Sequence, residues 1–266
     1  MKKLIILIST FAFSLSVLTL PGCAKKVSSV SANAGFVDVN TLPKTNEEIN
    51  NIRLTALREG ATSLGARGAL AWRSVHINRA LEQEAPYLDH VFDFNQLLLN
   101  SNVLPPILIE SNDNLTLGNN NVYRSANKVY KILSPARFVT APPTWRTYLW
   151  MPFKKPSLPN KSLLPTSRAE ALVWDEYLEN GWKQGLQQAN DIFSTNLNRL
   201  KRDYLGMILY RKLLAQKMIS APSVATADLG ITGNDKEMRI NDEITRITSH
   251  SALQLNSNEW KPVMTK

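Results

Sequence analysis

The feature that most constrains this chain is an apolar stripe of helical period that begins after Ser167 and continues for roughly 50 residues. Glu170 follows Ser167 at the spacing of a capping box, in which the two side chains satisfy free backbone N–H groups at a helix start. One helix of this length would span about 75 Å, longer than a compact domain of this size. We therefore expect a bend near Gly181, Gly185 or Gly206. The stripe consists of Ala171, Trp174, Leu178, Trp182, Leu186, Ala189, Phe193, Leu197, Leu200, Tyr204 and Ile208.

A second helical stripe lies nearer the N-terminus. It follows Thr45 and Glu48, which also have the capping-box spacing. It should end near Pro86, because proline has no backbone N–H and disfavours a helical conformation in the residue before it. Each glycine inside a helix costs about 1 kcal/mol relative to alanine, so glycines kept there indicate either a close backbone crossing or a break in the helix, and we favour the crossing. The glycines concerned are Gly60, Gly65 and Gly68.

Short extended segments fill the region between the two stripes, and turn-forming residues separate them. The clearest is 122–133, which has the β-branched and aromatic bias of a half-buried strand. The prolines at 105, 106, 142 and 143 must lie at edges or in loops, since proline cannot donate to a strand ladder. The other predicted strands are 93–99, 103–110 and 137–140.

Two further segments complete this organisation. Residues 151–165 hold four prolines and predict a stiff, extended connection. After the long stripe, residues 221–235 have a loop-like composition, and 237–255 predict a terminal hairpin with its turn near Asn241 and Asp242. The fold class that we predict is α+β: two long helices packed with a small, mostly antiparallel sheet in a single domain, residues 46–266.

The N-terminus has the composition of an export signal. Two lysines precede an apolar run, and the sequence Leu20-Pro21-Gly22-Cys23 follows it. This ending resembles the bacterial lipobox, which predicts a signal peptide over 1–22, lipidation of Cys23 and a flexible tether over 23–45. Pro21 departs from the small residue usual at that position. Ala24 after the cysteine, in place of aspartate, favours the outer membrane. The alternative is a cleaved, soluble protein with a free thiol at its only cysteine.

The composition is that of a globular protein with a formal net charge of +9. Such a charge permits attraction to acidic partners, nucleic acid included. The bases are scattered as pairs, such as Lys201-Arg202, and this pattern favours solvated helix faces. One cysteine allows no disulfide within the chain, so stability must come from packing or from partners in an assembly.

No motif in the sequence predicts catalysis, a metal or a cofactor. The three histidines lack metal-ligand spacing, no serine lies in a nucleophile motif, and no glycine-rich loop precedes the Lys-Ser or Lys-Thr of a phosphate-binding site. We therefore predict that the protein is not an enzyme. The alternative, a periplasmic enzyme acting on envelope components, would require Asp89, His90 or Glu110 to converge in a pocket.

Aromatic residues are the more informative signal. Trp145, Arg146 and Trp150 lie close together in the chain, and Trp174 and Trp182 line the long stripe. One interpretation is that these two aromatic clusters pack on each other as core. The other is a protein interface formed by Trp145, Arg146 and Trp150, since Trp and Arg are enriched in interface hot spots. A groove for translocating DNA is the third and weakest interpretation, because only one base is interleaved with the aromatics.

Five segments of the chain carry a resemblance to a known family: Arg58-Glu59-Gly60-Ala61, Phe92-Asp93-Phe94, Leu104-Pro105-Pro106-Ile107, Pro142-Pro143-Thr144-Trp145-Arg146-Thr147-Tyr148-Leu149 and Glu176-Tyr177-Leu178-Glu179-Asn180-Gly181-Trp182. Together they resemble the DotC family, outer-membrane lipoproteins of the Dot/Icm type IVB secretion system that are related to conjugative transfer lipoproteins. The similarity covers nearly all of the chain after the signal peptide. It implies a structural subunit of the outer-membrane core complex, in a multi-subunit ring with a DotD-like lipoprotein and a DotH-like, secretin-like protein, and with no catalytic residue. Nucleic acid is not an expected partner.

Overall fold

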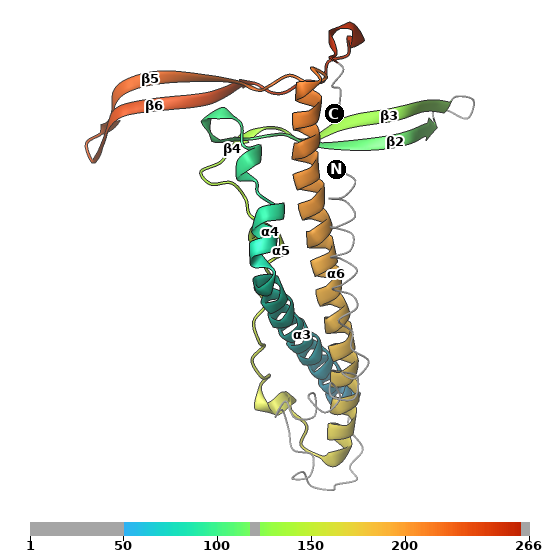
Figure 1. Cartoon of the computed structure of the whole chain (residues 1–266). Helices are drawn as coiled ribbons and strands as arrows, with labels where there is room; N and C mark the ends of the chain where they lie inside the picture. The colour runs from blue at the N-terminus through green and yellow to red at the C-terminus, as the bar shows by residue number, and fades with distance from the viewer. Residues whose placement is uncertain (1–50, 118–122, 262–266) are drawn as a thin grey trace. The chain divides into compact units, whose positions relative to one another are not determined.

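The computed structural model describes residues 51–117 and 123–261 (Figure 1). The chain forms two compact units. Unit 1 combines the chain up to Arg79 with Met151–Ile192, and unit 2 combines Ala80–Trp150 with Phe193–Lys266. We predicted one domain over 46–266. The division into two units does not fall between helices, because each of the two longest described helices contributes residues to both units. The predicted signal peptide, Cys23, the tether and the Thr45 capping box lie outside the described residues.

The predicted α+β class is confirmed. Long helices and short antiparallel strand pairs alternate along the described chain. The helices are α3 (Asn51–Gln83), α4 (Ala85–Val91), α5 (Trp145–Leu149) and α6 (Arg168–Ala215), with short 3-10 turns at Asn95–Leu97, Asn100–Asn102, Lys161–Leu163 and Ser257–Glu259. The strands are β1 (Val103–Leu104), β2 (Ile107–Leu117), β3 (Tyr123–Ser134), β4 (Arg137–Phe138), β5 (Ser223–Asn234) and β6 (Glu237–Ser249).

Helix boundaries follow the local chemistry of the sequence. The end predicted near Pro86 is confirmed: α3 stops at Gln83, and Pro86 lies in the first turn of α4, where a missing N–H breaks no intrahelical bond. At the start of α6 the Ser167 hydroxyl accepts the backbone N–H of Glu170 at 3.3 Å. No break interrupts α6, which is one continuous helix of 48 residues.

Glycines allow α3 and α6 to cross closely in unit 1, as predicted for Gly65. A Cβ built on Gly65 would overlap the carbonyl oxygen of Leu178. Gly181 and Gly185 of α6 meet the backbone of α3 in the same way, at Thr62 and Ala66. Gly181 and Gly185 therefore serve the crossing. Gly60 and Gly68 differ, since a Cβ there would meet tryptophan rings at 3.6 and 3.4 Å.

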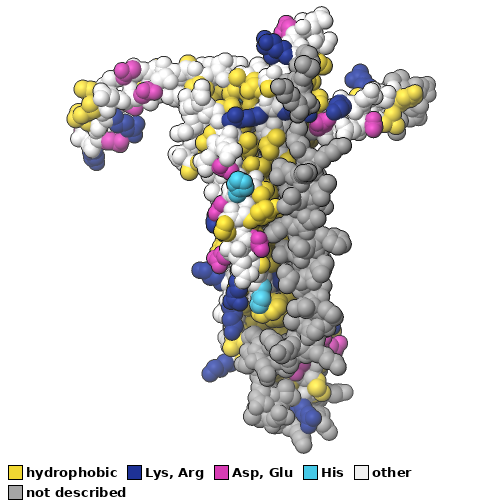
Figure 2. Space-filling view, in the orientation of Figure 1, with side chains coloured by type: hydrophobic (Ala, Val, Ile, Leu, Met, Phe, Trp, Pro, Cys, Tyr) yellow, Lys and Arg dark blue, Asp and Glu magenta, His cyan; other side chains and the backbone are white. Residues whose placement is uncertain are grey.

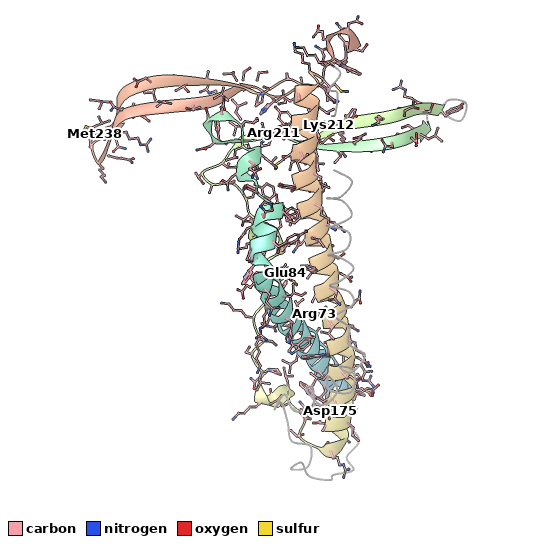
Figure 3. The ribbon with its side chains drawn as sticks, viewed as in Figure 1. Arg73, Glu84, Asp175, Arg211, Lys212 and Met238 are labelled. Atoms are coloured by element: carbon pink, nitrogen blue, oxygen red, sulfur yellow. The ribbon has the colours of Figure 1, made fainter. Side chains whose placement is uncertain are left out.

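Apolar side chains fill the crossing on either side of these glycines. The buried cluster consists of Leu57, Ala61, Leu64, Trp174 and Leu178. At the polar margin, Arg73 Nε donates to Asn190 Oδ1 at 2.9 Å, so α3 and α6 are also joined through a side-chain hydrogen bond (Figure 3). Residues 151–165 have little regular structure apart from the turn at Lys161–Leu163, which confirms the proline-rich connection.

In unit 2 the strands form three separate two-stranded antiparallel sheets among the described residues. β1 pairs with β4, β2 with β3, and β5 with β6. The last two are long ribbons, seen in Figure 1 beside the C-terminal part of α6. The base of the β2–β3 ribbon is fixed by packing, since a Cβ on Gly206 of α6 would lie 2.6 Å from the carbonyl oxygen of Leu108 in β2. The core there contains Leu108, Tyr210, Leu213 and Ile219.

Three predictions for unit 2 are wrong: the strand at 93–99, the loop at 221–235 and the turn near Asn241. Residues 93–99 form a 3-10 turn at Asn95–Leu97, because the Asp93 carboxylate accepts the backbone N–H of Asn95 at 2.9 Å and closes a local turn. Residues 221–235 are largely strand β5 and not a loop. The terminal turn lies between β5 and β6, after Asn234, and Asn241 instead sits at a bulge with a φ of 56°. Asparagine tolerates this left-handed conformation in bulges as well as in turns.

Candidate functional site

The segment that holds the predicted interface residues is built around the short helix α5. Thr144 caps it: the Thr144 hydroxyl and the Thr147 side chain form a reciprocal capping box. The helix ends when Trp150 becomes extended, and the N–H of Trp150 donates to the carbonyl of Arg146 at 3.0 Å. Prolines before and after α5 thus leave a single helical turn with fixed side-chain directions.

Trp145 is a core residue, and this corrects its assignment to an interface. It is 1% exposed, and its indole N–H donates to Asp89 Oδ1 at 2.6 Å. Arg146 donates to the same oxygen at 2.7 Å, and its guanidinium lies 4.2 Å from the centre of the Trp145 ring. A buried ring needs a partner for its N–H, and Asp89 supplies it. Trp145 therefore orients α5 and leaves almost none of its surface exposed.

The carboxylate of Asp89 is held in its charged form. The hydrogen bond from Arg146 lowers the pKa of Asp89, and the bond from Trp145 acts in the same direction. A lowered pKa is the opposite of what a general acid needs near neutral pH. Asp89 is thus placed to fix α5 against α4.

Arg146 and Trp150 remain available on the surface of unit 2. The Arg146 side chain is 45% exposed and Trp150 is 42% exposed. On the other side of the segment, Tyr148 stacks on Phe94 with ring centres 6.0 Å apart, and burial, followed by the nearby Asp203, raises the pKa of Tyr148 to about 12. One side of α5 is therefore core, and the interface hypothesis reduces to Arg146 and Trp150.

The two aromatic clusters lie in different units, so the interpretation that they form one core is not supported. Trp145 belongs to unit 2, whereas Trp174 and Trp182 belong to unit 1. Trp72 lies 6.1 Å from Trp182 and 3.9 Å from His76, ring centre to ring centre. His76 also has Nδ1 2.8 Å from the carbonyl oxygen of Trp72, which fixes its ring on α3.

Two of the three residues named for the enzyme alternative, Asp89 and Glu110, have partners of their own. Asp89 is bound by Trp145 and Arg146, and Glu110 of β2 accepts from Lys128 of β3 at 2.7 Å. These carboxylates lie on separate elements, α4 and the β2–β3 ribbon. Within residues 51–117 and 123–261, no group of three or more His, Cys, Asp or Glu side chains is placed to hold a metal ion.

Exposed apolar side chains on the two long ribbons are a feature that the sequence reasoning missed. On β5–β6, Ile231, Met238 and Ile240 are 69%, 67% and 65% exposed. On β2–β3, Leu115 and Tyr123 are 62% and 70% exposed. Figure 2 shows apolar side chains at the outer ends of both ribbons. The alternation of Met238 and Ile240 was the available signal, but its partner Ile231 fell in a segment interpreted as a loop.

These observations define an α+β protein with two helices crossed at glycines and with apolar surface exposed on strand ribbons. Residues 51–262 match the family described as type IV secretory system, conjugal DNA-protein transfer, and the chain belongs to this family. It is thus a type IV secretion or conjugal transfer component, part of a multi-subunit system. No curated protein gives a significant match to the chain.

Within the part of the chain that the structure describes, no helix is both long enough and apolar enough to cross a lipid bilayer.

Proposed function

We propose that this protein is a lipid-anchored structural subunit of the outer-membrane core complex of a type IVB secretion system, of the DotC type. In this role Cys23 carries the lipid, residues 23–45 act as a tether, and the folded units lie at the periplasmic face of the outer membrane. The partners are a DotD-like lipoprotein and a DotH-like, secretin-like protein, whose placement in the membrane it assists. The proposal includes no enzymatic step.

The observation that carries this proposal is the exposed apolar surface of unit 2. Soluble monomers seldom leave clustered large apolar side chains uncovered, and such clusters mark interaction sites. Here Trp150, the β2–β3 ribbon and the β5–β6 ribbon all present them. Membership of a secretion and conjugal transfer family supplies the context in which other subunits would cover these surfaces.

The DotC-like segments give the proposal its finer identity, and all five contain residues that are buried in the fold. Gly60 and Gly181 border the helix crossing, Phe94 packs against Tyr148, and Trp145 binds Asp89. The segments that carry the resemblance thus include residues that build the fold as well as the exposed Arg146. This favours a common architecture over a shared short motif.

The anchor is tested by following lipid attachment directly. Cells expressing the full chain, or its Cys23→Ser variant, are grown with an alkyne-labelled fatty acid and their membranes are separated. We expect label on the wild-type chain in the outer-membrane fraction and none on Cys23→Ser, since the lipid is attached through the thiol. A wild-type chain that carries no label, yet is recovered in the outer-membrane fraction as fully as Cys23→Ser, would contradict the anchor. Circular dichroism of both proteins controls for folding.

A further inference from the structure

The first turns of α3 bury little apolar surface. Asn51, Ile52 and Thr55 are exposed, and Ile52 is 81% exposed. Along the described helix the first buried residue is Leu57. The Thr55 hydroxyl donates to the carbonyl of Asn51 at 3.0 Å, a bond within the helix that does not tie it to another element. A helix end with little buried apolar surface opens locally at low free energy.

Arg53 connects these first turns to the rest of unit 1. Its guanidinium donates two hydrogen bonds of 3.0 Å to the carboxylate of Glu170 in α6. It also donates to the carbonyl oxygen of Leu164 at 2.7 Å and to that of Ser162. The side chains of Arg53 and Glu170 are 26% and 10% exposed, so solvent screens this pair less than a surface pair. A two-bond, charged contact of this kind is stronger than a neutral hydrogen bond.

From these contacts we infer that Arg53 is a conformational device, here called the clasp, which holds residues 51–56 and the turn at 160–163 against the start of α6. Figure 1 shows that α3 and α6 begin at the same end of unit 1. When the clasp is closed, residues 51–56 belong to the folded unit. When it opens, they join the chain that precedes them, while the helix crossing beyond Leu57 stays intact.

One guanidinium serves two segments that are distant in sequence, so the clasp predicts that both open together. The turn is closed by the N–H groups of Leu163 and Ser162, which donate to the carbonyl and side-chain oxygens of Asn160 at 2.8 and 3.2 Å. Arg53 holds this turn from outside, through the carbonyl of Ser162. Simple fraying of a helix end would leave the turn unchanged.

The clasp deepens the proposed function, on which its role rests. In a lipid-anchored subunit the chain before residue 51 leads to Cys23, and the clasp fixes the residue at which the tether ends. Opening converts residues 51–56 from about 9 Å of helix into up to about 20 Å of extended chain. The clasp therefore limits how far unit 1 can stand from its anchor.

Amide hydrogen exchange of the purified full chain, read at single residues by NMR, tests the clasp. In Arg53→Ala we expect the amides of residues 55–57 and 162–163 to exchange about tenfold faster than in wild type, because both segments lose their shared contact. The amide of Thr166 is an internal reference. It donates to Glu170 at 2.8 Å without Arg53 and should stay protected. Unchanged exchange at 162–163 would overturn the inference.

Gly185→Ala is the matched control for a loss of stability elsewhere in unit 1. It adds a Cβ that overlaps the carbonyl of Ala66 and so weakens the helix crossing. Amides 64–66 should then exchange about tenfold faster, whereas amides 55–57 should stay within about twofold of wild type, because their opening leaves the crossing intact. Equal acceleration of the two segments by Gly185→Ala would contradict a local clasp.

The wild-type chain provides a second measurement that does not depend on the folding of any variant. Opening of residues 51–56 exposes little apolar surface, so exchange at 55–57 should hardly change in low urea. Opening of the crossing exposes its buried cluster, so exchange at 64–66 should rise with urea. The same urea dependence at both places would show that residues 51–56 open only with the crossing, which overturns the inference.

The clasp and the proposed function can fail separately. Exchange is measured on the isolated chain and reports only local opening, whereas fatty-acid labelling reports the anchor at Cys23. A chain that opens at 55–57 and 162–163 as expected, but carries no lipid, would keep the clasp and contradict the proposed function. A lipid-labelled chain in which these segments do not open together would keep the anchor and refute the clasp.

Discussion

Arg53 of α3 and Glu170, in the first turn of α6, form an ion pair through two parallel hydrogen bonds of 3.0 Å each. Arg53 also donates to the carbonyl oxygens of Ser162 and Leu164, in the segment that leads into α6. Glu170 in turn accepts from the backbone N–H and the hydroxyl of Thr166, at 2.8 and 3.0 Å. One guanidinium therefore joins α3, the proline-rich connection and the start of α6 within unit 1.

Replacing Arg53 should destabilise unit 1 in a pH-dependent way. We expect Arg53→Ala to lower the free energy of unfolding by about 1–3 kcal/mol at neutral pH, because Glu170 loses a charged partner. The Arg53 hydrogen bonds, against the opposing effect of burial, hold the pKa of Glu170 at about 2, below its ordinary 4.5. A carboxylate with a lowered folded-state pKa stabilises fully above 4.5 and loses that contribution as the pH falls toward 2.

Urea unfolding at neutral pH and near pH 3 measures this effect, and the difference between wild type and Arg53→Ala should shrink in acid. Lys183→Ala is the matched control. It breaks a 2.9 Å pair with Glu179 in which both side chains are more than half exposed, so it should change the unfolding free energy by less than about 0.5 kcal/mol. A difference between wild type and Arg53→Ala that is constant with pH would contradict the assigned role of Glu170.

The helix crossing predicts opposite effects for two glycine-to-alanine substitutions. Gly185→Ala adds a Cβ that overlaps the carbonyl of Ala66, so we expect a loss of about 1–3 kcal/mol in the free energy of unfolding. Gly60→Ala places its Cβ at an ordinary 3.6 Å from the Trp174 ring and should stabilise by up to about 1 kcal/mol through helix propensity. Urea denaturation compares the two, and a stabilised Gly185→Ala would refute the close crossing.

The contacts of Asp89 predict an order of effects in unit 2. Asp89→Ala should lower the denaturation midpoint more than Arg146→Ala, because it leaves the buried N–H of Trp145 without its acceptor. Arg146→Ala removes one exposed partner and leaves the bond from Trp145 to Asp89 in place. The midpoints of thermal unfolding decide the order. Equal midpoints for the two variants would show that the Trp145 bond contributes little.

Trp150 should matter for assembly more than for stability. It is 42% exposed, so we expect Trp150→Ala to change the free energy of unfolding by no more than about 1 kcal/mol while reducing recovery of other subunits with the tagged chain. Leu158→Ala, at a 51% exposed position outside the α5 segment, is the control and should leave recovery unchanged. Undiminished recovery with Trp150→Ala would remove this residue from the interface.

Much of the fold could be predicted where local rules act alone. Proline chemistry placed the end of α3 and the irregular connection before α6, and the capping residue Ser167 marked the start of α6. The bend expected in α6 shows where such rules end. In a sequence, a glycine that bends a helix cannot be told from one that makes room for a neighbouring backbone. For Gly181 and Gly185 the role becomes clear only from their contacts with the backbone of α3.

The candidate interface was harder to predict because exposure depends on partners distant in sequence. Trp145 and Trp150 look equivalent along the chain, yet Asp89, 56 residues away from Trp145, binds one ring and buries it. The ribbon faces were missed for a related reason. Bulges at Leu229 and Asn241 shift the ladder of β5 and β6, so the alternation that identifies a strand is broken in β5.

Recovery of the assembly from its native membrane tests the central claim most directly. The full chain, tagged at its C-terminus, is extracted from outer membranes in mild detergent, purified, and its companions are identified by mass spectrometry. We expect a DotD-like lipoprotein and a DotH-like, secretin-like protein to be recovered with it. A chain that is fully extracted yet purifies without any other secretion subunit would contradict its role as a structural part of the outer-membrane core complex.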